Sequence, residues 1–174
     1  TTGNTMVRDE LGQAKELDLS SLEWLPNHSF EEVSGLLGEG AVIFNVSNYE
    51  TRKNWTSQTK DEKFIYPLIH STPKKGARYY YSSRKDKGHF GVPKAIFGDS
   101  GINDVIIDVD GDYGMTQHAM AIPIESKEDG ELLKEYLMSA EFKNILNACS
   151  WSNFQIDWRT FRDFKQGFWR AQIE

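Results

Sequence analysis

A basic, tyrosine-rich segment, residues 73–89, holds the residue types whose spacing most clearly suggests a chemistry. It interleaves cations, tyrosines and serines in the order PKKGARYYYSSRKDKGH. Lysine and arginine neutralise phosphates, while arginine, tyrosine and serine meet bases by hydrogen bonding or stacking. The segment therefore predicts contact with nucleic acid. The alternative is a solvated hairpin whose alternate tyrosines pack inward.

The side chains of this segment divide into two expected roles. The four lysines are expected to neutralise phosphates: Lys74, Lys75, Lys85 and Lys87. Two arginines, a tyrosine and a serine are better suited to base or sugar contacts: Arg78, Arg84, Tyr80 and Ser83. An arginine can donate two parallel hydrogen bonds to the edge of a guanine, which makes Arg78 and Arg84 candidate base readers.

The net charge of the chain conceals this segment. The 174 residues include 20 Lys and Arg against 26 Asp and Glu, a net charge of −6. Residues 52–94 carry 11 basic and 3 acidic side chains, a balance of +8, between blocks of −7 (residues 1–51) and −9 (residues 95–141). The acidic mean argues against a protein coated with positive charge, but it leaves room for one basic face.

A second set of residues allows a different function. Asp108 or Asp112, followed by Glu125 and Lys127, matches the Asp…Glu-x-Lys pattern of nucleases, in which two carboxylates hold Mg²⁺ and the lysine orients water. Ser126 has a competing interpretation as the N-cap of a helix, which we favour. A third possibility is a protein-interaction module that binds another chain through exposed tyrosines. We assign no catalytic residue and no metal ligand.

Hydrophobic periodicity and turn residues predict the elements that must position these side chains. After an extended arm, short apolar or alternating runs predict strands at 41–46, 63–69, 77–82, 94–97, 104–109 and 115–124. A short helix is expected over 30–37 with Ser29 as its N-cap, and later helices begin after Ser126 and Ser139. We therefore expect an α+β fold, a mainly antiparallel sheet followed by C-terminal helices.

The domain organisation is expected to be simple. Residues 1–50 would form an arm, a short helix and a first strand, and residues 51–174 an α+β domain, both within one compact unit cut from a longer chain. No apolar run approaches the roughly 18 residues needed to span a membrane. The single cysteine, Cys149, excludes an intramolecular disulfide and favours a cytoplasmic location.

Four motifs follow one another from residue 64 onward. They are FIYP at 64–67, FGVPKAIF at 90–97, DGDYGMTQ at 110–117 and the helical ELLKEYLMSAEF at 131–142. This order resembles the C-terminal target-recognition region of adenine-N6 DNA methyltransferases and of fused type II restriction-modification enzymes. The resemblance implies sequence-specific recognition of double-stranded DNA, and it adds Lys94 and Gln117 as DNA-contact candidates.

The same resemblance implies a division of labour. In that family a catalytic domain with an Asn-Pro-Pro-Tyr motif flips the adenine, and a separate domain reads the DNA. Neither that motif nor the glycine motif for S-adenosylmethionine occurs in these 174 residues. The resemblance therefore implies that this fragment does not methylate alone, that S-adenosylmethionine belongs to the parent enzyme, and that the catalytic domain of the same polypeptide is a partner.

Overall fold

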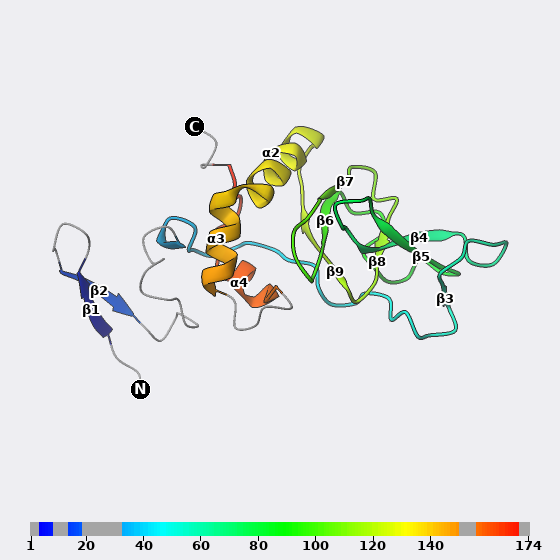
Figure 1. Cartoon of the computed structure of the whole chain (residues 1–174), viewed down its shortest axis with the longest axis horizontal. Helices are drawn as coiled ribbons and strands as arrows, with labels where there is room; N and C mark the ends of the chain where they lie inside the picture. Colours follow the sequence, from blue (N-terminus) through cyan, green and yellow to red (C-terminus); the bar gives the residue numbers. More distant parts are fainter. Residues whose placement is uncertain (1–3, 9–13, 19–32, 150–155, 171–174) are drawn as a thin grey trace.

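A computed structural model describes residues 4–8, 14–18, 33–149 and 156–170 of the chain. Antiparallel-rich sheets are followed by helices that lie mostly late in the chain, between residues 127 and 162. The expected α+β class with C-terminal helices is thus confirmed. Figure 1 shows the strands of residues 56–123 on one side of the helices of residues 127–162, and we call these two parts the sheet half and the helical half.

A four-stranded sheet carries most of the basic segment. It contains β3 (Thr56–Ser57), β4 (Tyr66–Ser71), β5 (Arg78–Ser82) and β8 (Gly114–Met115) in the order β3-β5-β4-β8. β4 and β5 form an antiparallel hairpin, whereas β8 runs parallel to β4. The register shifts between Ile69 and Ser71, so that His70 lies at a bulge. The hairpin confirms the strand predictions at 63–69 and 77–82, within a few residues at their ends.

The second, three-stranded sheet is antiparallel and central. It contains β6 (Lys94–Gly98), β7 (Ile106–Asp108) and β9 (Ala119–Pro123) in the order β7-β6-β9, and every residue of β6 is buried. The run predicted as one strand over 115–124 is divided between β8 and β9. A turn separates them, in which the Ala119 amide donates to the Thr116 carbonyl at 3.1 Å.

The strand predicted over residues 41–46 is wrong. This segment makes one isolated bridge, a pair of hydrogen bonds between the backbones of Phe44 and Ala121, of 2.7 and 3.1 Å. Phe44 packs against the small core of the sheet half, whereas Val42 and Val46 are exposed. An apolar run looks like a buried strand in sequence, but here its side chains divide between two hydrophobic cores, with Ala41 and Ile43 against the larger one and Phe44 against the smaller one.

Three helices form the other half: α2 (Lys127–Met138), α3 (Ala140–Cys149) and α4 (Trp158–Arg162). The Ser126 hydroxyl accepts a hydrogen bond from the Asp129 amide at 3.1 Å, and the Ser139 hydroxyl accepts one from the Phe142 amide at 3.1 Å. Both predicted caps are confirmed. Ser29 and residues 30–32 of the helix predicted over 30–37 lie outside the described residues. Residues 33–34 are helical and a turn follows, but Leu37 forms a bridge with Phe164, so the helix is shorter than predicted.

Two hydrophobic cores differ in composition. The larger one joins the helices to β6 and β9 and centres on four fully buried rings whose centroids lie 4.9 to 6.4 Å apart: Phe142, Phe161, Phe164 and Phe168. The smaller one holds aliphatic side chains of the two sheets, with Ile69, Ile96 and Met115 at its centre. The smaller core therefore lies between the two sheets, whereas the larger, aromatic core lies between the three-stranded sheet and the helices.

The first described residues pair with one another. β1 (Asn4–Arg8) and β2 (Ala14–Asp18) form an antiparallel two-stranded sheet in the part of the chain expected to be an extended arm. In the described ranges, no helix has the length and apolar character needed to cross a membrane.

Candidate nucleic-acid interface

The turn between β4 and β5 presents the first pair of lysines. Pro73 and Gly76 close the turn, with the Gly76 amide donating to the Pro73 carbonyl at 3.0 Å and Gly76 at a φ of +113°. Lys74 and Lys75 occupy the middle of the turn and are exposed. Neither has an ion-pair partner among the described residues, so both ammonium groups are available to an external anion.

β5 presents Arg78 and Tyr80 on one of its faces, because alternate residues of a strand point the same way. Arg78 is exposed and, within the described chain, forms no ion pair. The Tyr80 ring lies 4.7 Å from the His70 ring, and its hydroxyl accepts a hydrogen bond from Gln58 Nε2 at 2.8 Å. Tyr80 is therefore held in a fixed position beside an exposed arginine.

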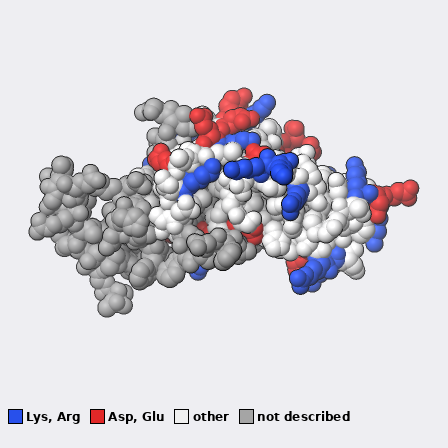
Figure 2. Space-filling view, in the orientation of Figure 1, with Lys and Arg blue, Asp and Glu red and all other residues white. Residues whose placement is uncertain are grey.

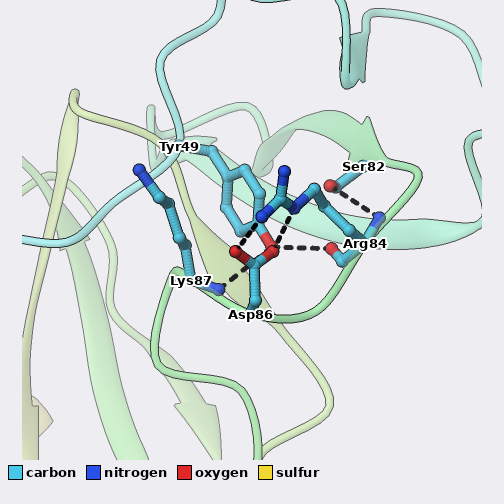
Figure 3. A network of polar contacts seen from close by, with 5 residues as sticks. All are labelled: Tyr49, Ser82, Arg84, Asp86 and Lys87. Carbon is cyan, nitrogen blue, oxygen red and sulfur yellow. Dashed lines mark hydrogen bonds and ion pairs between the residues drawn. The ribbon is translucent and has the colours of Figure 1, made fainter.

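The loop after β5, residues 83–88, is fastened to a buried tyrosine (Figure 3). Tyr49 is 0% exposed, and its hydroxyl donates to the Arg84 carbonyl at 2.6 Å and accepts from the Lys87 amide at 3.2 Å. Burial raises the pKa of Tyr49, so the hydroxyl keeps its proton. The loop is also tied to the sheet where the Ser83 amide donates to the Trp55 carbonyl at 3.0 Å.

Arg84 forms an ion pair within this loop. Its Nε and Nη2 donate to the two carboxylate oxygens of Asp86, and its guanidinium lies 5.3 Å from the centre of the Trp55 ring. The hydrogen bond from Arg84 lowers the pKa of Asp86, and the same bond raises the pKa of Arg84. The Arg84 side chain remains 48% exposed.

The two remaining lysines of the loop are exposed. Lys85 Nζ lies 4.9 Å from the centre of the Tyr66 ring and 5.6 Å from that of Phe90, so the aromatic rings orient this cation. Lys87 forms no ion pair with any residue that the structure describes. Ser83 is half-buried beside them. Eight of the ten predicted contact residues thus belong to the turn, strand and loop of one β-hairpin.

Lys94 lies in the interior and not on this surface, contrary to its prediction as a DNA contact. The side chain is 0% exposed, and its Nζ donates to Asp108 Oδ2 at 2.7 Å and to the Val92 carbonyl at 3.1 Å. Asp108, 2% exposed, also accepts hydrogen bonds from the amides of Asp112 and Tyr113. Lys94 is therefore a structural cation that joins β6 to the turn after β7.

Gln117 lies in the turn between β8 and β9, apart from the hairpin in sequence. It is exposed, but its amide group is engaged at both ends. Oε1 accepts from the Thr51 amide at 3.0 Å, and Nε2 donates to the Thr51 hydroxyl at 3.1 Å. Gln117 thus fixes the segment that leads from Tyr49 toward β3.

A histidine pair lies beside Arg78, although the four histidines look scattered in the sequence. The rings of His70 and His118 lie 5.0 Å apart, and His118 Nδ1 lies 3.4 Å from Asp99 Oδ2. Burial lowers the pKa of His70, the charge of His118 lowers it further, and Asp99 opposes both. No local sequence pattern could reveal the pair, because the two residues are 48 positions apart.

The carboxylates of the nuclease alternative are engaged separately. Asp108 pairs with Lys94, and Glu125 pairs with Arg170 at 2.8 Å. Ser126, between Glu125 and Lys127, caps α2. In the part of the chain that the structure describes, no three His, Cys, Asp or Glu side chains gather to hold a metal ion. The geometry offers this alternative no support.

Charge is distributed unequally between the two halves. Figure 2 shows the largest group of acidic side chains over α2, while Lys and Arg side chains lie across the sheet half. The exposed acidic residues of that helix include Glu128, Glu131 and Glu135. An anionic ligand approaching the molecule is therefore drawn toward the hairpin rather than the helices. No protein-family model matches the sequence, and no curated protein matches it either.

Proposed function

We propose that this chain binds double-stranded DNA through the β4–β5 hairpin and the loop that follows it. The proposal includes the role of target-recognition domain in an adenine-N6 DNA methyltransferase of a restriction-modification system, whose catalytic domain would bind S-adenosylmethionine. The observation that carries it is a set of exposed cations without ion-pair partners in the described chain: Lys74, Lys75, Arg78 and Lys87.

The lack of partners is informative because acidic residues outnumber basic ones in this chain, 26 against 20. In the helical half, three cations pair with a carboxylate at 2.8 Å, namely Lys134, Arg159 and Arg170. The exposed lysines of α2 and α3, Lys127 and Lys143, share their helices with exposed glutamates. Leaving several cations unpaired on one surface keeps a positive potential there, and phosphate neutralisation is its most direct use.

The dimensions of the hairpin fit a duplex. Lys74 and Lys75 precede the five residues of β5, and Lys85 and Lys87 follow them. At about 3.3 Å per residue, β5 spans about 17 Å between the turn and the loop that carry the two lysine pairs. That distance corresponds to about five base pairs of DNA at 3.4 Å each. Two pairs of phosphate contacts would thus flank the central residues Arg78 and Tyr80.

A titration of a fluorescent duplex against salt concentration tests the proposal. We expect the affinity to fall steeply with salt. Replacing Lys74 and Lys75 by Gln should weaken binding and lower the slope of log K against log [salt] by about 0.9 for each phosphate that the variant no longer neutralises.

The matched control replaces Lys127 and Lys143, two exposed lysines of the helices, by Gln. This variant has the same net charge as the turn variant and should bind as the unmodified chain does. Absence of binding at low salt, or equal reductions of affinity in the two variants, contradicts the proposal.

A further inference from the structure

The guanidinium of Arg84 is bound by Asp86 along one edge, and along another edge its hydrogens have no acceptor among the described residues. An arginine has five N–H donors in a planar fork. Asp86 accepts from Nε and from one hydrogen of Nη2, which leaves the second hydrogen of Nη2 and both hydrogens of Nη1. In Figure 3 the third guanidinium nitrogen points away from Asp86. The open edge therefore carries two adjacent donors with nearly parallel directions.

The rest of the environment fixes the plane of this group. The Trp55 ring lies against the guanidinium at 5.3 Å, which restricts its tilt without using its hydrogens. The backbone is fixed on both sides, because the Arg84 amide donates to Ser82 Oγ at 3.1 Å and the Arg84 carbonyl accepts from Tyr49. Few rotamers of Arg84 remain to be restricted when a ligand binds.

The charge of the pair indicates what kind of ligand the open edge would take. Asp86 neutralises Arg84 and is itself 44% exposed beside it. A phosphate placed at Arg84 would meet this carboxylate as well, whereas an uncharged base edge would not be repelled. The O6 and N7 acceptors of guanine, in the major groove, match two parallel donors.

On the basis of the proposed DNA-binding function, we infer that Arg84 is a specificity-determining residue that recognises a guanine. Asp86 and Trp55 are positioning residues that orient the guanidinium. Lys85 and Lys87, on either side of Asp86 in sequence, supply the phosphate contacts that bring the loop to the groove. In this arrangement the lysines provide affinity for DNA. The neutralised arginine provides discrimination between bases.

Selection from a pool of duplexes with a randomised central segment tests the inference with the full 174-residue chain. We expect enrichment of guanine at one position, with a preference of roughly 5- to 150-fold over the other bases. Arg84→Lys should abolish this preference, because an ammonium group cannot donate the two parallel bonds. Arg162→Lys is the matched control and should keep it, because Arg162 is an exposed arginine of α4 that also lies over a Trp ring but is outside the hairpin.

Asp86→Asn gives the sharpest outcome. The change removes a negative charge, so affinity for unselected duplexes should stay equal or rise, while the guanine preference should fall. A contribution of Asp86 to folding alone would not move these two quantities in opposite directions. Replacing the selected guanine by 7-deazaguanine should weaken binding of the unmodified chain, but not of Arg84→Lys.

The outcomes separate this inference from the function on which it rests. Salt-dependent binding with no base preference, or a guanine preference that survives Arg84→Lys, overturns the role of Arg84 and leaves DNA binding intact. Absence of binding to any duplex at low salt overturns both. Thermal melting of each variant confirms that the compared chains are folded.

Discussion

The aromatic cluster of the helical half and the aromatic rings beside the basic loop have different roles. In the helical half, Phe142, Phe161 and Phe168 are fully buried and contact one another. In the sheet half, Trp55 and Tyr66 are half-buried and lie against the cations Arg84 and Lys85. The rings at the centre of the helical half provide cohesion, whereas those beside the basic loop orient charges, as Trp158 and Trp169 do for Arg162 and Arg170 at the edge of the helical half. Composition alone therefore does not reveal what an aromatic residue does.

The largest expected effect lies in the aromatic core. Phe142→Ala should lower the free energy of unfolding by about 3 to 5 kcal/mol, because it leaves a cavity among rings that cannot close around it. Tyr80→Ala, on the hairpin, should cost about 1 kcal/mol, since its ring is half-buried. Urea denaturation followed by circular dichroism measures both. Equal reductions of the free energy of unfolding in the two variants would contradict the expected difference between the aromatic core and the hairpin.

A pair of lysine variants sharpens the contrast between a structural and a surface cation. Lys94→Met should destabilise the fold by about 3 to 5 kcal/mol, because Asp108 would remain buried without its cation. Lys87→Met should change stability by no more than about 0.5 kcal/mol. DNA binding should follow the opposite order at temperatures where both chains are folded. Loss of DNA affinity in a folded Lys94→Met chain would show that Lys94 does contribute to DNA binding.

Asp129 joins α2 to the last described residues of the chain, Trp169 and Arg170. Its carboxylate, nearly buried, accepts from Trp169 Nε1 at 2.9 Å and from Arg170 Nε at 2.8 Å. Asp129→Asn should cost about 1 to 3 kcal/mol. Glu128→Gln, its exposed neighbour, is the control and should change little.

The pH dependence of that destabilisation has a definite sign. Burial favours the protonated form of Asp129, but hydrogen bonds from Arg170, the Glu125 amide and Trp169 outweigh burial and lower its pKa. The stabilisation is therefore present above about pH 4, the ordinary pKa of aspartate, and is lost as the pH falls through the lower folded value. Denaturation at pH 6 and pH 3 should show that acidification destabilises the variant less than the unmodified chain.

The smallest expected effect comes from the histidine pair in the sheet half. The pKa of His70 is lowered by burial and by His118, so the folded chain binds fewer protons than the unfolded chain just below pH 6.5. Stability should therefore fall as the pH drops below that value. His70→Gln should flatten this dependence between pH 7.5 and 5.5 in thermal melts. An unchanged slope would show that His70 does not titrate between the two states.

Local signals in the sequence predict much of the fold but less of the site. Ser126 and Ser139 cap their helices as expected, because capping depends on residues three positions away. The basic hairpin is also a local feature. The burial of Lys94 depends on Asp108, across the β6–β7 pair, and the orientation of Arg84 depends on Tyr49, 35 positions earlier. Such contacts require the tertiary structure, since neither residue alone differs from a surface cation.

The attachment of the 83–88 loop to Tyr49 has a consequence for how the surface can change during evolution. Tyr49 holds the loop through the carbonyl of residue 84 and the amide of residue 87, which are main-chain groups. These two bonds are independent of the side chains at those positions. Mutations can therefore exchange the exposed side chains while the loop keeps its path, so that a family of such domains could diversify its targets on one inherited frame.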